Sequence, residues 1–164
     1  LRTSVNQRSL TRLLWRKKTH ALTRSSSNTR KKMVNKKHRK CGQCTECCTA
    51  LKIISLDKPA GSSCKHLKRH GCGFYESRPE ECRGFQCAWS EHLLPNSARP
   101  DKSGIMAYRH ESQWGDTLTL VELRKGALQR NARHVNTLQH LVDRKAWALV
   151  VIDSEGRSAA MVPQ

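Results

Sequence analysis

The sequence predicts an α+β fold in which a small cysteine-rich module precedes a small antiparallel sheet with one helix. Three observations lead to this prediction. All eight cysteines of the 164-residue chain fall between residues 41 and 87. Four segments after residue 103 alternate apolar and polar residues or run apolar between turn residues, as strands do. Between the second and the third of these segments, apolar residues recur at steps of three and four, which is the period of a helix.

Residues 1 to 40 form a basic tail that we expect to be disordered. Of the net charge of +18, residues 1 to 32 contribute ten Lys or Arg and no acid, and residues 33 to 40 add four more basic groups. Residues 41 to 164 hold 17 basic and 13 acidic residues, a balance of only +4. Because the chain begins at Leu1 and Met33 lies eight residues before Cys41, we expect residues 1 to 32 to be upstream of a true start at Met33. A solvated arm, a nucleic-acid-binding arm and an organelle presequence stay open.

The cysteine pattern of residues 41 to 90 predicts a module stapled by metal. It reads C-x2-C-x2-C-C-x15-C-x7-C-x9-C-x4-C and comprises Cys41, Cys44, Cys47, Cys48, Cys64, Cys72, Cys82 and Cys87. A C-x2-C turn brings two soft thiolates within reach of one ion, which suits zinc or an iron-sulfur cluster. Four disulfides are the alternative, but the N-terminal residues lack the regions of a secretory signal, and four thiols within eight residues are poorly spaced to pair.

The way in which the first four thiols share metal is open. Cys41 and Cys44 form the clearest pair, because Gly42 allows the tight turn between them. Cys47 and Cys48 are adjacent, and adjacent side chains on an extended backbone point to opposite sides. We therefore expect these two cysteines to serve two neighbouring centres.

The spacing fits more than one kind of centre. C-x2-C-x2-C is how ferredoxin-like chains offer three ligands to one 4Fe-4S cluster, whose distant fourth ligand would be Cys82 or Cys87. Two zinc sites of four cysteines each fit the count equally well. His66 and His70 lie near cysteines in the sequence, but with eight thiols present we expect them to support the site or to be exposed.

Two short elements are expected between the cysteines. Leu51 to Leu56 alternates enough for a strand. Ser77 followed by Glu80 is typical of a capping box, with Pro79 in the first turn, so a short helix should begin near Arg78.

Several side chains are expected to surround the metal. Arg78 and Arg83 could offset the formal charge of −2 that four thiolates leave around one zinc ion. Four aromatic residues could screen the centre from water, or simply pack in a core: Phe74, Tyr75, Phe85 and Trp89. Glu46 is the one carboxylate inside the cluster that could act as a general base, although a solvated loop carboxylate is the commoner case.

Residues 91 to 164 are expected to form the α+β part, packed on the module as one domain. Residues 91 to 102 contain two prolines and many turn formers, and read as a connector. The expected strands are Gly104 to His110, Thr117 to Leu123, Trp147 to Asp153 and Arg157 to Val162. The expected helix runs from Ala127 to Lys145, with an apolar stripe of Leu128, Ala132, Val135, Leu138 and Val142.

A family resemblance rests on the cysteine block. CGQCTECC, Cys64 followed by His66 and Leu67, and then GCGFYESRPEECRGFQCAW resemble the YkgJ-type cysteine-cluster family, also called the CxxCxxCC or zinc- or iron-chelating domain. The resemblance covers residues 41 to 90 most strongly. It implies metal chelation without a defined substrate, and a distant relationship to flagellin lysine methylases, whose cysteine cluster is associated with iron-sulfur chemistry.

These observations predict a cytoplasmic metal-ion-binding protein that chelates zinc or iron, without a membrane segment and with any protein partner unknown. There is no G-x-x-x-x-G-K-[ST], G-x-G-x-x-G or H-E-x-x-H motif and no C-x3-C-x2-C pattern, so we lean against an enzyme. Two alternatives stay open. One is an iron-sulfur-dependent redox or methyltransfer-related enzyme. The other is a zinc-stabilised nucleic-acid-binding protein, which requires the basic tail to be part of the protein.

Overall fold

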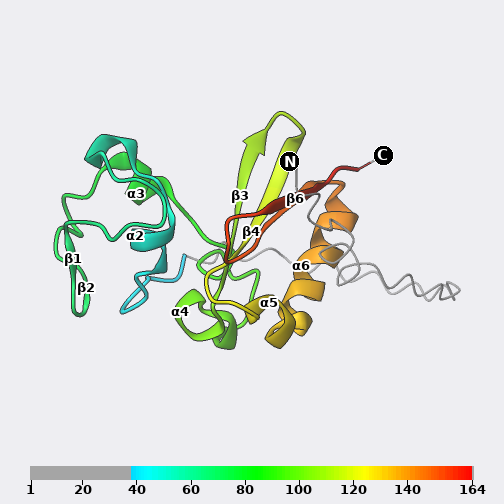
Figure 1. Cartoon of the computed structure of the whole chain (residues 1–164), viewed down its shortest axis with the longest axis horizontal. Coiled ribbons are helices and arrows are strands. Elements are labelled where there is room, and N and C mark those ends of the chain that lie inside the picture. The colour runs from blue at the N-terminus through cyan, green and yellow to red at the C-terminus, as the bar shows by residue number, and fades with distance from the viewer. Residues whose placement is uncertain (1–37, 164) are drawn as a thin grey trace, which may run out of the picture. The chain divides into compact units, whose positions relative to one another are not determined.

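A four-stranded sheet organises the second half of the computed structural model, which describes residues 38 to 163 (Figure 1). Its strands lie in chain order: β3 (Ile105–Ser112), β4 (Gly115–Glu122), β5 (Ala148–Ile152) and β6 (Ser158–Met161). The four predicted strands are confirmed. The expectations for residues 1 to 37 of the basic tail and for a start at Met33 lie outside the described residues. At residues 38 to 40 the expectation of a disordered tail is wrong, because the Arg39 backbone N–H donates to the Ser90 carbonyl at 2.9 Å.

The predicted antiparallel sheet is wrong at its central pairing. β3 and β4 are antiparallel, as are β5 and β6, but β4 and β5 run parallel. Helices α5 (Ala127–Arg130) and α6 (Ala132–Lys145) lie between them in the chain. They form the crossover that parallel neighbours require, so the sheet is mixed.

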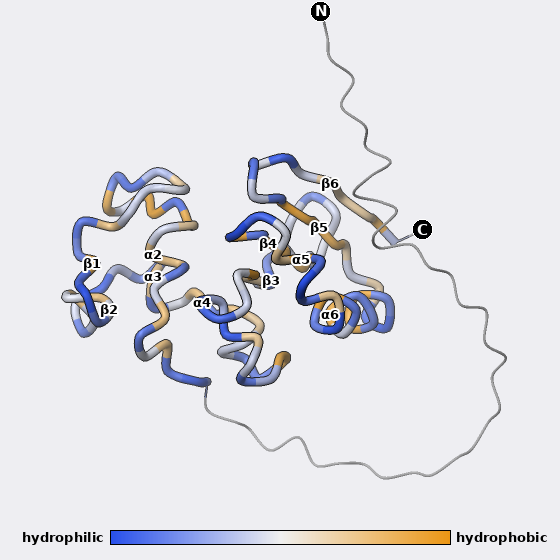
Figure 2. Tube along the Cα trace, turned by 60° about the horizontal axis from the view of Figure 1, so that its bottom comes forward, coloured by the Kyte–Doolittle hydropathy of each residue, from blue (hydrophilic) through white to orange (hydrophobic). Residues whose placement is uncertain are grey.

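The core lies between this sheet and α6. Leu118, Leu120 and Leu149 are at most 1% exposed on the two central strands, and β5 shows as an apolar run in Figure 2. The predicted stripe of α6 is confirmed at Val135, Leu138 and Val142, which are the buried residues of this helix, but not at Ala132, which is exposed.

The predicted helix of residues 127 to 145 is divided at Asn131. The Asn131 side-chain amide donates hydrogen bonds to the carbonyl oxygens of Ser103 and Ala127, both at 2.8 Å. An asparagine that bonds nearby backbone groups competes with the regular helical pattern. The first turn, α5, therefore ends and α6 begins at the next residue.

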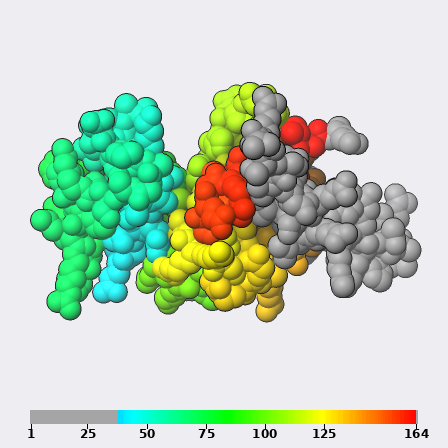
Figure 3. Space-filling view, viewed as in Figure 1, coloured from blue at the N-terminus to red at the C-terminus, as the bar shows by residue number. Residues whose placement is uncertain are grey.

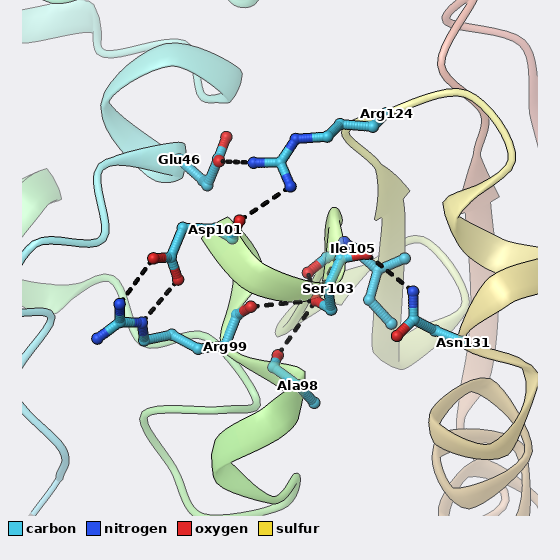
Figure 4. A network of polar contacts seen from close by, with 8 residues as sticks. All are labelled: Glu46, Ala98, Arg99, Asp101, Ser103, Ile105, Arg124 and Asn131. Atoms are coloured by element: carbon cyan, nitrogen blue, oxygen red, sulfur yellow. Dashed lines mark hydrogen bonds and ion pairs between the residues drawn. The ribbon is translucent and has the colours of Figure 1, made fainter.

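The expected connector contains two short helices, η2 (Asn96–Ala98) and α4 (Pro100–Ser103), and α4 ties the first half of the chain to the sheet (Figure 4). Arg124, just after β4, donates to the backbone carbonyl of Asp101 at 2.9 Å and to the carboxylate of Glu46 at 2.7 Å. The Asp101 carboxylate accepts two hydrogen bonds from Arg99, at 2.6 and 2.7 Å. The Arg124 guanidinium thus joins Glu46 to α4, two segments that are far apart in the sequence.

Short elements make up the cysteine-rich segment, which is coloured cyan to green in Figure 3. They are α2 (Glu46–Ala50), η1 (Ile54–Leu56), β1 (Leu67–Lys68), β2 (Gly71–Cys72) and α3 (Glu80–Gly84). Almost no hydrophobic core accompanies them. Of the buried apolar side chains among the described residues, only Ile53 lies between residues 41 and 87.

Both elements that were expected between the cysteines differ in detail. The strand predicted at Leu51 to Leu56 is wrong: Ile53 pairs with Lys58 in a single bridge, and the residues between them turn back through η1 and the left-handed Asp57. The short helix α3 is present, but it begins at Glu80 with Pro79 as its N-cap and has no side-chain cap hydrogen bond. The predicted capping box is therefore not formed.

No helix among the described residues is long and apolar enough to cross a membrane.

Candidate metal centre

One cavity collects all eight cysteines. It measures about 230 Å³, and its lining includes Cys41, Cys44, Cys47, Cys48, Cys64, Cys72, Cys82 and Cys87. All eight are free and only partly exposed. The fold therefore brings the eight predicted cysteines into the lining of one cavity.

The first cysteines sit on a turn that runs into α2. The Cys44 N–H donates to the Cys41 carbonyl at 3.0 Å, and Gly42 between them has a φ of 58°. This is the tight turn that the C-x2-C spacing predicts. Cys47 and Cys48 follow within α2, so the expectation of an extended backbone is wrong. On a helix, adjacent side chains project about 100° apart rather than to opposite sides.

The middle cysteines are joined through the backbone. The Cys64 N–H donates to the Cys48 carbonyl at 3.0 Å, and the Cys64 carbonyl accepts from Leu67 at 2.9 Å. Leu67 in turn pairs with Cys72 in the two-stranded sheet of β1 and β2. Backbone contacts therefore link Cys48, Cys64 and Cys72, which all line the cavity.

The last two cysteines are held by α3 and by the sheet. Next to Cys82 on α3, the Glu81 carboxylate accepts backbone N–H groups of Ile54 at 3.1 Å and Ser55 at 3.0 Å. Cys87 pairs with Tyr108 of β3 in an isolated antiparallel bridge. The main sheet therefore fixes one edge of the cavity.

The adjacent thiols Cys47 and Cys48 have opposite pKa shifts. A hydrogen bond from Cys47 lowers the pKa of Cys48 to about 7, against the effect of burial, and the charges of Lys58 and Arg78 lower it further. The same hydrogen bond, followed by burial, raises the pKa of Cys47. Cys48 is thus the thiol that most readily becomes a thiolate ligand among those whose pKa is shifted.

Two buried N–H donors belong to residues that line the cavity. Arg78 stacks its guanidinium 3.8 Å from the Tyr75 ring centre, and its Nε has no hydrogen-bond partner. Trp89 Nε1 is likewise buried without a partner. The charge of Arg78 acts on Cys48, in keeping with its expected role, whereas Arg83 forms an exposed ion pair with Glu80 at 3.1 Å.

The remaining predicted site residues fall into two groups. His66 lines the cavity and stacks on Phe74 at 4.7 Å between ring centres, while His70 is exposed and is not part of the lining. The four predicted aromatic residues all line the cavity. Glu46 does not: it forms the ion pair with Arg124, so it is neither a solvated loop carboxylate nor placed as a general base in the cavity.

The donor set fits a metal in its chemistry but not in its arrangement. Within residues 38 to 163, no group of three or more His, Cys, Asp or Glu is arranged so that it could hold a metal ion. A tetrahedral zinc site needs four ligands about 2.0 to 2.3 Å from one point. The thiols instead surround a cavity much larger than one ion. The unpartnered donors of Arg78 and Trp89 suit an anionic, thiolate-rich group.

Comparisons with known proteins do not assign the chain. No family model matches it, and no curated protein and no solved structure matches it. The resemblance to the YkgJ-type family therefore stays a prediction that rests on the residues quoted above.

Proposed function

We propose that the protein binds zinc or iron through its eight cysteines. The observation that carries this proposal is the single cavity lined by all eight thiols. Thiolates are the ligands that zinc and iron-sulfur clusters prefer.

The lack of an apolar core supports the same proposal. Residues 41 to 87 bury only Ile53 among their apolar side chains. A segment of this size without hydrophobic burial needs another source of folding free energy, and metal binding supplies it, because a site that is complete only in the folded state returns its binding energy as stability.

Binding requires the thiols to turn toward one another. All eight cysteines are partly exposed, so their side chains have room to rotate about χ1 without displacing a packed core. Deprotonation accompanies binding, since the ligand is the thiolate. Cys48, with a pKa of about 7, would lose its proton at the least cost.

An iron-sulfur cluster is the second kind of metal site that an observation favours. The cavity of about 230 Å³ exceeds the space of a single ion, and one wall carries C-x2-C-x2-C, the spacing with which ferredoxin-like chains hold three irons of a cluster. An iron-sulfur group would give the site a redox function.

We assign the protein to the cytoplasm, where thiols are kept reduced and available to metal.

The test is the metal content of the full chain, purified without air, together with its visible absorption spectrum and acid-labile sulfide. Bound zinc without colour supports a closed thiolate site, and iron with sulfide and broad visible absorbance supports the cluster. A protein that retains neither metal, and takes up neither on anaerobic reconstitution, would overturn the proposal.

Two variants make the measurement specific. Replacing all eight cysteines with serine should abolish binding. His70→Ala is the matched control, because His70 lies in the same segment but outside the cavity lining, and it should leave the metal content unchanged.

A further inference from the structure

The eight cysteines divide into two backbone-linked sets. The first begins with the turn in which the Cys44 N–H donates to the Cys41 carbonyl at 3.0 Å. Cys47 follows at the same spacing, on the first helical turn after it. These three cysteines lie within seven residues of the chain, and all three line the cavity.

Cys87 joins this first set through the segment that precedes Cys41. Arg39 donates its backbone N–H to the Ser90 carbonyl at 2.9 Å and its guanidinium to the Trp89 carbonyl at 2.7 Å. The chain approaching Cys41 therefore runs beside the chain leaving Cys87. In agreement, the charge of Cys87 is the largest effect on the pKa of Cys41 after burial, and it raises that pKa.

The second set is built on the Cys48 carbonyl. The Cys48 carbonyl accepts a hydrogen bond from the Cys64 N–H, and Leu67, which donates to the Cys64 carbonyl, pairs with Cys72. These contacts link the three cysteines through the backbone. Burial is the main cause that raises the pKa of Cys82, and the next causes are the charges of these same three thiols. Cys82, on α3, is the remaining cysteine of the cavity lining and is placed in this set.

The two sets meet at α2. Cys47 and Cys48 are consecutive and their thiols share a hydrogen bond, so the two groups of sulfur atoms are neighbours rather than distant sites. The hairpin of β1 and β2 also approaches the first turn, since a Cβ built on Gly71 would lie 3.4 Å from the Gly42 carbonyl. One cavity can thus contain two adjacent groups of four.

We propose that the cavity is two adjacent tetrathiolate centres that meet at α2, one formed by Cys41, Cys44, Cys47 and Cys87 and the other by Cys48, Cys64, Cys72 and Cys82. This inference rests on the proposed metal binding and adds to it the number of centres and the membership of each. Four thiolates complete the coordination of one zinc ion, so each set closes one centre. The first set also has three ligands in ferredoxin-like spacing and supplies the distant fourth as Cys87.

The experiment compares double variants that remove the same number of thiols. Cys41→Ser/Cys44→Ser removes two ligands of the first set, and Cys44→Ser/Cys64→Ser removes one from each. The full chain and both variants are reconstituted with Zn²⁺ without air, and bound zinc is counted. We expect two equivalents in the wild type, one in the first variant and none in the second.

Two results would overturn the inference. One is equal zinc loss in both double variants, and the other is a wild type that binds only one ion. Zinc titration of the wild-type chain, followed by native mass spectrometry, gives a second answer that needs no variant: species with one and with two ions are expected, and a single one-ion species overturns the two-centre model. A wild type that takes up neither zinc nor iron instead means that the proposed metal binding fails.

Discussion

At the scale of single residues, Lys58 is the least expected feature of the cysteine-rich segment. It is 6% exposed, and its ammonium group donates to the carbonyls of Thr49 at 3.0 Å, Pro59 at 3.1 Å and Leu51. Thr49 lies on α2, and Leu51 is the residue that caps it. A positive charge at a helix C-terminus satisfies carbonyls that have no partner within the helix. Lys58 therefore holds the end of the helix that carries two cysteines.

Lys58→Met should destabilise the protein by about 1 to 3 kcal/mol, because methionine keeps the apolar stem but leaves buried carbonyls without a donor. Urea unfolding of the full chain measures this difference. Lys52→Met is the matched control, since Lys52 is exposed in the same segment and its replacement should change stability by less than about 0.5 kcal/mol. Equal effects of the two substitutions would show that the Lys58 contacts contribute nothing.

At the scale of elements, the turn between β5 and β6 depends on Asp153. Its carboxylate accepts the backbone N–H groups of Glu155 and Arg157, both at 2.9 Å, and the Arg157 guanidinium at 2.7 Å. Its side chain is only 5% exposed. Burial alone would raise the pKa of Asp153, but the hydrogen bonds from Arg157 outweigh it and hold the pKa below its usual range. The turn thus gains stability from the ionised carboxylate.

Asp153→Asn should cost about 1 to 3 kcal/mol at pH 7, where the wild-type carboxylate is ionised and accepts all three hydrogen bonds. The pKa of Asp153 is lower in the folded state than the value of about 3.9 in the unfolded chain. Its stabilising effect is therefore complete above about pH 4 and is lost as the pH falls through the folded-state pKa. The stability difference between wild type and variant should shrink over that range.

Unfolding by urea from pH 7 to pH 3 tests this expectation. Asp116→Asn serves as the control, because Asp116 is exposed near the start of β4. A difference between wild type and Asp153→Asn that stays constant from pH 7 to pH 3 would contradict the assignment of the effect to the Asp153 charge.

The elements that the sequence predicted are those with their own periodicity. The strands and α6 follow from apolar residues at fixed steps, such as Val135, Leu138 and Val142. The parallel pairing of β4 with β5 could not be read in the same way, because strand direction depends on where the crossover packs. The break at Asn131 likewise depends on Ser103, a partner that is distant in the sequence.

At the scale of the whole molecule, the cysteines of the cavity lining were predictable, but the proposed division of them into two sets was not. Cysteine is rare enough that eight within residues 41 to 87 identify the cavity lining directly. The choice between Cys82 and Cys87 as partner of the first turn was open, because it depends on how residues 39 to 41 run beside the segment after Cys87. Such long-range pairing leaves no local pattern in a chain.

The uneven distribution of buried apolar side chains also predicts how residues 41 to 87 and residues 88 to 151 respond to metal. Nearly all buried apolar side chains belong to residues 88 to 151, so the sheet and α6 should stay folded when metal is removed. Residues 41 to 87, in which Ile53 is the one buried apolar side chain, should lose their structure. Local opening is most frequent where few apolar contacts are buried.

Hydrogen exchange of the full chain, with Zn²⁺ and after chelation, measures this response. Free zinc at 100 times its Kd stabilises the binding-competent state by about 2.7 kcal/mol, which slows exchange by about 100-fold wherever opening releases the ion. We expect this protection in peptides from residues 41 to 87 and little change in β4, β5 and α6, which serve as the internal control. Slowing of the same size in the sheet would mean that the chain unfolds as one unit. Equal protection of residues 41 to 87 with and without zinc would mean that metal does not hold the segment together.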